Sequence, residues 1–120
     1  MEDFYNAVRK DITMIRGDSM AFNFQLQGLA GAEVIDIKFT CKEHYDDEIP
    51  YFTKSLTSGG ITVQSYDETK DITTYCCRVS PEDTENLDLA RFYYDLELTV
   101  GLDVITLMKG RITIEYDVTN

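Results

Sequence analysis

Strict alternation of apolar and polar residues most constrains the fold of this chain, and it occurs in residues 19–27, 34–42 and 91–100. The apolar positions are Met20, Phe22, Phe24 and Leu26 in the first segment, Ile35, Ile37, Phe39 and Cys41 in the second, and Phe92, Tyr94, Leu96, Leu98 and Val100 in the third. A period of two places every second side chain on the same face of a β-strand. Three such segments predict an antiparallel sheet with one buried face and one face exposed to water.

Weaker strands are predicted between these segments, at residues 11–15, 51–56, 61–65, 73–79 and 104–118. In the last of them, the apolar residues before Gly110 have the opposite parity to those after it. An extra residue near Lys109-Gly110, a β-bulge, would bring both halves onto the core side. The tripeptide Gly101-Leu102-Asp103 predicts a hairpin between this strand and the one before it.

A single helical segment is predicted, from a cap at Ser80 to about Leu89. Ser80 is a favoured N-cap, Pro81 stands at the first helical position, and acidic residues fill the first turn. About eight short strands with one short helical crossover predict an all-β fold, an Ig-like antiparallel β-sandwich. We expect an N-terminal arm at residues 1–10 and a single sandwich domain at residues 11–120.

The charge of the chain excludes several classes of partner. Its 120 residues carry 22 Asp and Glu against 11 Lys and Arg, a formal net charge of -11. Such a balance disfavours binding to nucleic acid or to anionic lipid, because both need a basic surface. The sequence has no run of 18 apolar residues and begins without an apolar signal segment. We therefore expect an intracellular protein that binds neither nucleic acid nor membrane.

Catalytic and metal-binding constellations are weak in this sequence. The soft metal ligands are Cys41, His44, Cys76 and Cys77, and the last two are neighbours that point to opposite faces of a strand. We therefore predict buried, reduced thiols, with no metal, no cofactor and no catalytic residues. Acid-rich loops at residues 46–48, 67–71 and 82–88 are predicted to be solvated, although the sequence leaves calcium binding open. The tetrapeptide Arg16-Gly17-Asp18-Ser19 is predicted to be a turn rather than an adhesion motif.

Aromatic residues supply the best candidate for a contact surface. The set comprises Tyr45, Tyr51, Phe52, Tyr66, Tyr75, Phe92, Tyr93, Tyr94 and Tyr116. Tyr93 has outward parity on its strand and lies between Arg91 and Asp95. Exposed tyrosine is favoured at interfaces, because it buries a large area at little entropic cost. Tyr93, Arg91 and Asp95 are therefore the candidate protein-contact residues, with simple covering of the sheet as the alternative reading of Tyr93.

The order of turns and strand edges resembles a known family. The matching motifs are Ile15-Arg16-Gly17-Asp18-Ser19, the Phe22/Phe24 strand, Gly60-Ile61, Ser80-Pro81-Glu82-Asp83-Thr84, Tyr93-Tyr94-Asp95-Leu96, Lys109-Gly110, Ile112-Thr113-Ile114 and Asp117-Val118-Thr119. Together they run from about residue 12 to residue 119. The pattern resembles short structural β-sandwich proteins of tailed bacteriophages and prophages, similar to the N-terminal module of the siphophage baseplate upper protein.

The resemblance implies a non-enzymatic virion structural module, such as a tail, baseplate or neck adaptor. Its partners would be other virion proteins or further copies of itself. It would be found in the cytoplasm of the bacterial host during assembly and then in the virion. The baseplate upper protein continues into a further region that carries the receptor-binding subunits, whereas this sequence ends at Asn120. An alternative function is suggested by the charge of -11: a small acidic inhibitor from a mobile element that binds a basic groove of a host enzyme.

Overall fold

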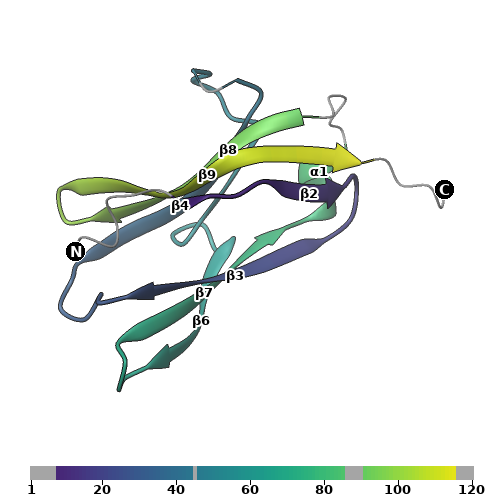
Figure 1. Cartoon of the computed structure of the whole chain (residues 1–120). Coiled ribbons are helices and arrows are strands. Elements are labelled where there is room, and N and C mark those ends of the chain that lie inside the picture. The colour runs from purple at the N-terminus through teal and green to yellow at the C-terminus, as the bar shows by residue number, and fades with distance from the viewer. Residues whose placement is uncertain (1–7, 45, 86–90, 116–120) are drawn as a thin grey trace.

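The computed structural model describes residues 8–44, 46–85 and 91–115, and Figure 1 shows two layers of strands packed face to face. The strands are β1 (Val8–Arg9), β2 (Ile12–Ile15), β3 (Met20–Gln27), β4 (Val34–Lys42), β5 (Phe52–Ser55), β6 (Ile61–Asp67), β7 (Ile72–Val79), β8 (Arg91–Val100) and β9 (Asp103–Glu115). A one-turn helix, α1 (Pro81–Thr84), lies between β7 and β8. The predicted all-β class is confirmed.

The strand order is that of an immunoglobulin-like sandwich. The larger sheet has the order β1-β9-β8-β4-β5 with β2 also paired to β9, and the smaller sheet has the order β3-β7-β6. The neighbours β4, β8 and β9 correspond to the C, F and G strands of that fold, while β3, β7 and β6 correspond to B, E and D. The Ig-like β-sandwich predicted from the sequence is therefore confirmed.

Strand direction departs from the prediction at the N-terminus. Both β1 and β2 run parallel to β9, with Val8 opposite Met108 and Ile12 opposite Ile112. A purely antiparallel sandwich was thus wrong for these two strands. Alternation shows which face of a strand is buried but carries no information on the direction of the strand. The pairing of β1 and β2 with β9 also joins opposite ends of the chain, which no local pattern predicts. Because β1 includes Val8 and Arg9, residues 8–10 belong to the sandwich, and the rest of the predicted arm lies outside the described residues.

The core between the sheets is built around Phe39 of β4. Its ring centroid lies 5.4 Å from that of Phe22 on β3, 5.2 Å from that of Tyr94 on β8 and 6.2 Å from that of Phe52 on β5. Antibody domains join their two sheets at this level with a disulfide packed on a tryptophan. Here an aromatic cluster joins them, and the three cysteines are free thiols.

The predicted bulge in the last strand is present, but it lies at Leu107 rather than at Lys109-Gly110. Pairing of β8 with β9 steps from Leu96–Met108 to Glu97–Thr106, which leaves Leu107 as the extra residue. Gly110 is needed for a different reason. It is buried, and a Cβ atom there would collide with the carbonyl oxygen of Lys10, so glycine allows the N-terminal segment to approach β9 closely.

A second irregularity corrects the predicted inward position of Ile35. The register of β4 against β8 shifts between Val34 and Asp36, and the Ile35 side chain is 46% exposed. The inward positions Ile37, Phe39 and Cys41 further along the same strand are fully buried, as the alternation predicts. Alternation alone cannot locate a bulge near a strand end, because the shift affects only one residue there.

The crossover helix begins as predicted. Ser80 is the N-cap, Pro81 is the first helical residue, and the Asp83 carboxylate accepts a hydrogen bond of 2.7 Å from the Ser80 N–H. The helix ends at Thr84, and the predicted continuation to Leu89 falls on residues 86–90, outside the described ranges. Within the described part of the chain, no helix has the length and apolar character needed to cross a membrane.

Candidate functional site

The candidate contact residues lie on the outward face of β8, in the middle of the larger sheet. Tyr93 is half-buried and pairs with Lys42 on β4 and with Arg111 on β9. The guanidinium carbon of Arg111 lies 5.9 Å from the centre of the Tyr93 ring, within the range of a cation–π interaction. The ring therefore lies in a row of three cross-strand neighbours, with a cation on each side.

Asp95 occupies the next outward position on β8, opposite Thr40 on β4 and Lys109 on β9. Its Oδ1 atom is buried and has no hydrogen-bond partner among the described residues. Burial raises the pKa of the Asp95 carboxyl, and the positive charge of Lys42 acts in the opposite direction. The sheet thus holds a carboxylate whose charge is only partly satisfied by its own chain.

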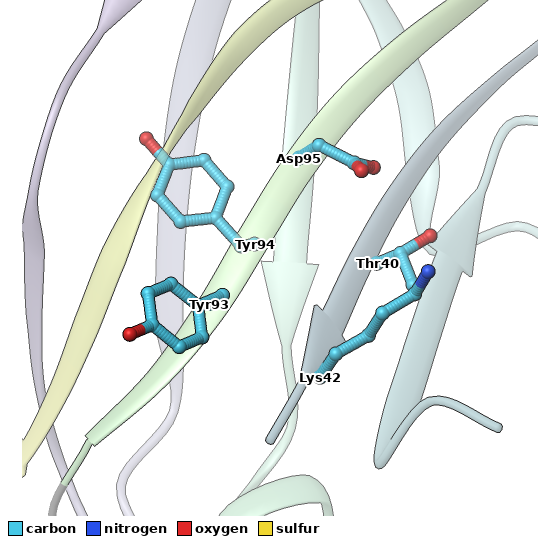
Figure 2. A pocket seen from close by; sticks show the side chains of 5 residues that line it. All are labelled: Thr40, Lys42, Tyr93, Tyr94 and Asp95. Atoms are coloured by element: carbon cyan, nitrogen blue, oxygen red, sulfur yellow. The ribbon is translucent and has the colours of Figure 1, made fainter. Parts of the chain in front are cut away.

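A shallow hollow lies beside Asp95, lined by Thr40, Lys42, Tyr93, Tyr94 and Asp95 (Figure 2). Figure 2 shows Asp95 of β8 next to Thr40 and Lys42 of β4. The hollow has a volume of about 10 Å³, whereas pockets for small organic ligands measure about 300–1,000 Å³. A hollow of this volume is too small to hold such a ligand.

The charge of this face differs from that of the whole chain. The outward residues of β4, β8 and β9 are called the Tyr93 face below. Its cations are Lys38, Lys42, Arg91, Lys109 and Arg111, and its acids are Asp36, Asp95, Glu97 and Glu115. Five positive charges against four negative ones give a formal charge of +1, while the whole chain carries -11. Among the described residues, the excess of acidic over basic side chains therefore lies outside the Tyr93 face.

The structure brings Arg91, Tyr93 and Asp95 onto one face, as their parity predicts. Sequence reasoning missed the cations around them, Lys42 and Arg111 above all. Lys42 comes from a strand distant in sequence, whereas Arg111 lies on the strand that the predicted hairpin at residues 101–103 pairs with β8. A sequence signal did exist for both residues, since each has outward parity on a strand. Parity does not show which strands are neighbours in the sheet.

The thiol and imidazole groups are dispersed. Cys41 and Cys77 are buried, and burial raises the pKa of each thiol to about 12, so both are protonated and unreactive at neutral pH. His44 is exposed, with its Nε2 atom 3.7 Å from Glu43. Over residues 8–44, 46–85 and 91–115, no three His, Cys, Asp or Glu side chains form a group able to hold a metal ion.

Acidic side chains in the loops accept hydrogen bonds from backbone N–H groups. Asp67 accepts hydrogen bonds from the N–H groups of Thr69 and Lys70, and Asp71 accepts one from the N–H group of Ala30.

The Arg16-Gly17-Asp18-Ser19 segment is a turn closed by a 3.1 Å hydrogen bond from the Asp18 N–H to the Ile15 carbonyl, with Gly17 at a φ of 81°. The turn predicted at residues 16–19 is confirmed by this hydrogen bond and by the positive φ of Gly17.

The remaining tyrosines are spread over the molecule. Tyr75 and Tyr94 are buried, whereas Tyr51 and Tyr66 are about half exposed at 49% and 51%. Tyr66 lies on β6 of the smaller sheet and donates a hydrogen bond of 3.0 Å to Asp71. It is an exposed tyrosine outside the Tyr93 face, and it serves as a matched control below. Tyr45 and Tyr116 lie outside the described residues.

Comparison with known proteins finds matches among solved structures alone. No family model and no curated protein matches the chain. Among solved structures, the chain is similar to murine CRIg, with 13% sequence identity and a TM-score of 0.46. The matched region covers 89% of this chain and 92% of the CRIg chain.

Proposed function

We propose that this chain is a non-enzymatic structural module that works through protein–protein contacts, with the Tyr93 face as its contact surface. The observation that carries the proposal is the row formed by Lys42, Tyr93 and Arg111 on a sheet face that is positive in an acidic protein. Tyrosine and arginine are the residue types most enriched among the residues that dominate binding energy. The half-buried Asp95 occupies the next outward position on the same strand.

The charge of the Tyr93 face indicates the chemistry of its partner. A face of formal charge +1 in a chain of -11 can accept an acidic protein surface that the rest of the chain would repel. The resemblance to the baseplate upper protein module supports a virion location for this partner. In the full proposal, the chain is a tail, baseplate or neck adaptor of a tailed bacteriophage, made in the host cytoplasm and incorporated into the particle.

The test is a tagged pull-down from lysate of the producing or infected host, read by mass spectrometry. Wild type is compared with Tyr93→Glu and with Tyr66→Glu, which makes the same change at an exposed tyrosine of the other sheet. We expect tail, neck or capsid proteins to co-purify with wild type and with Tyr66→Glu. Their recovery with Tyr93→Glu should fall at least tenfold.

Two results would overturn the proposal. Equal recovery of virion proteins with Tyr93→Glu and Tyr66→Glu would remove the Tyr93 face as the contact surface. Capture of a host nuclease or polymerase that dissociates in moderate salt would instead establish the acidic inhibitor, because contacts between exposed opposite charges are screened by salt.

A further inference from the structure

The free edge of β3 differs from the other strand edges of this protein. β3 (Met20–Gln27) pairs with β7 over its whole length without a register shift, and no strand in the described part of the chain pairs with its other edge. Its sequence, MAFNFQLQ, contains no charged residue and no proline. Charges, prolines and bulges are the devices that keep strand edges from pairing with other chains. The β3 edge has none of them.

The other end of the same sheet is protected by comparison. β6 forms that edge, and its register against β7 shifts between Val63 and Ser65. It also ends in the charged residue Asp67. In the larger sheet, the edge strand β5 has only four residues and includes Lys54. At the opposite edge of that sheet, β1 and β2 have only two and four residues. Among the described strands, β3 is therefore the one whose free edge is long, regular and neutral.

Backbone groups on β3 point toward solvent at alternate residues. The Arg78 N–H on β7 donates to the Gly60 carbonyl, so the peptide groups of Arg78 point toward β6. Ala21 is the register partner of Arg78, and its N–H and C=O groups therefore point away from β7. By the same alternation, Asn23 and Gln25 present their peptide groups at the free edge. Their side chains are exposed.

Apolar side chains next to this edge are incompletely covered. Met20, Phe22 and Phe24 face the core but are only half-buried. Beside them, a groove of about 200 Å³ opens between β3 and the N-terminal segment of the larger sheet. Its apolar lining comes from Ile12, Met20, Phe22 and Met108. A strand added to the β3 edge would pair the peptide groups and cover these side chains together.

We infer that the β3 edge binds the β3 edge of a second copy of this chain, in antiparallel orientation. The net charge of -11 repels two copies at long range, and the uncharged β3 edge is a contact that adds no local repulsion between them. Parity also fits. With Asn23 opposite Asn23 of the second copy, Phe22 lies opposite Phe24 and Ala21 lies opposite Gln25. Edge-directed peptide groups then meet edge-directed ones, and apolar side chains meet on the core side.

The test is the oligomeric state of the full chain, measured by sedimentation velocity over a range of concentrations. Asn23→Asp is isosteric and adds a negative charge next to the two-fold axis, and Gln64→Glu adds the same charge to the exposed face of the other edge strand, β6. We expect wild type and Gln64→Glu to dimerise with the same dissociation constant. Asn23→Asp should raise that constant at least tenfold, and added salt should recover part of the loss.

A monomeric wild type throughout the concentration range would overturn the inference. A dimer that Asn23→Asp leaves unchanged would overturn it as well, since association would then use another surface. Thermal melting of each variant verifies that the fold is retained. Tyr93→Glu should leave the dimer intact, so failure of the β3 pairing and failure of the Tyr93 face give distinguishable results.

Discussion

Tyr93 and Tyr94 are neighbours of the same residue type on opposite faces of β8, and their surroundings differ completely. Tyr94 is 2% exposed, its ring stacks on Phe39, and its hydroxyl donates a hydrogen bond to the Lys10 carbonyl. It therefore ties β8 to the segment between β1 and β2. Tyr93 lies between Lys42 and Arg111 on the opposite side of the same strand. One amino-acid type thus packs in the core on one face of β8 and lies among charged side chains on the other.

The largest expected effect comes from introducing a charge at each tyrosine in turn. Tyr94→Glu places an unpaired carboxylate in the core and removes a buried ring, so we expect a loss of about 4 kcal/mol or more in the free energy of unfolding. Tyr93→Glu should change it by less than about 0.5–1 kcal/mol, because the side chain is half-buried on the outer face. Urea denaturation of both variants measures the difference. Equal losses would contradict the division between the two faces of β8.

A second prediction concerns a charge that does lie on the inner side of the sandwich. Lys54 of β5 is opposite Phe39, and its Nζ atom lies 2.7 Å from the Asp83 carboxylate at the start of α1, with both side chains largely buried. Lys54→Met leaves that carboxylate without its counter-charge. We expect a loss of about 2 kcal/mol, below the 3–5 kcal/mol of fully buried pairs.

Lys70→Met, at an exposed turn, is the control for Lys54→Met and should change stability by less than about 0.5 kcal/mol. The double variant Lys54→Met/Asp83→Asn should recover part of the loss. Its amide oxygen still accepts the hydrogen bond from the Ser80 N–H, and no unpaired charge remains. Chemical denaturation of all three variants measures these differences. A double variant less stable than Lys54→Met would show that Asp83 contributes mainly through its charge at the helix start.

The smallest expected effect is at Asp95 and depends on pH. Because the pKa of this carboxyl is raised in the folded protein, its contribution to stability is present below the pKa of the unfolded chain and is lost as pH rises through the folded pKa. Asp95→Asn should therefore raise the melting temperature by a few degrees at pH 7 and by nothing at acidic pH. Melting curves from pH 3 to pH 8 measure this, with Glu97→Gln as control. If the difference in melting temperature between wild type and Asp95→Asn were the same from pH 3 to pH 8, it would contradict the role of burial in raising the pKa of Asp95.

The sequence allowed prediction of the strands, of most of their buried faces and of the hairpin between β8 and β9, but not of the other strand pairings. Alternation located β3, β4 and β8 within one residue and identified Tyr93 as outward and Tyr94 as inward. It misplaced the bulge of β9 because Gly110 was interpreted as a local irregularity. The glycine is explained instead by a contact with Lys10, a residue 100 positions away.

What the sequence by itself determined is the face of each strand, because side-chain parity is a local property of an extended backbone. The tertiary structure decided which strands are neighbours, and with that the cations beside Tyr93, the burial of Asp95 and the open edge of β3. Each of these features depends on contacts between segments far apart in the chain. Such contacts are selected by packing of the whole core, and no single segment contains the information that specifies them.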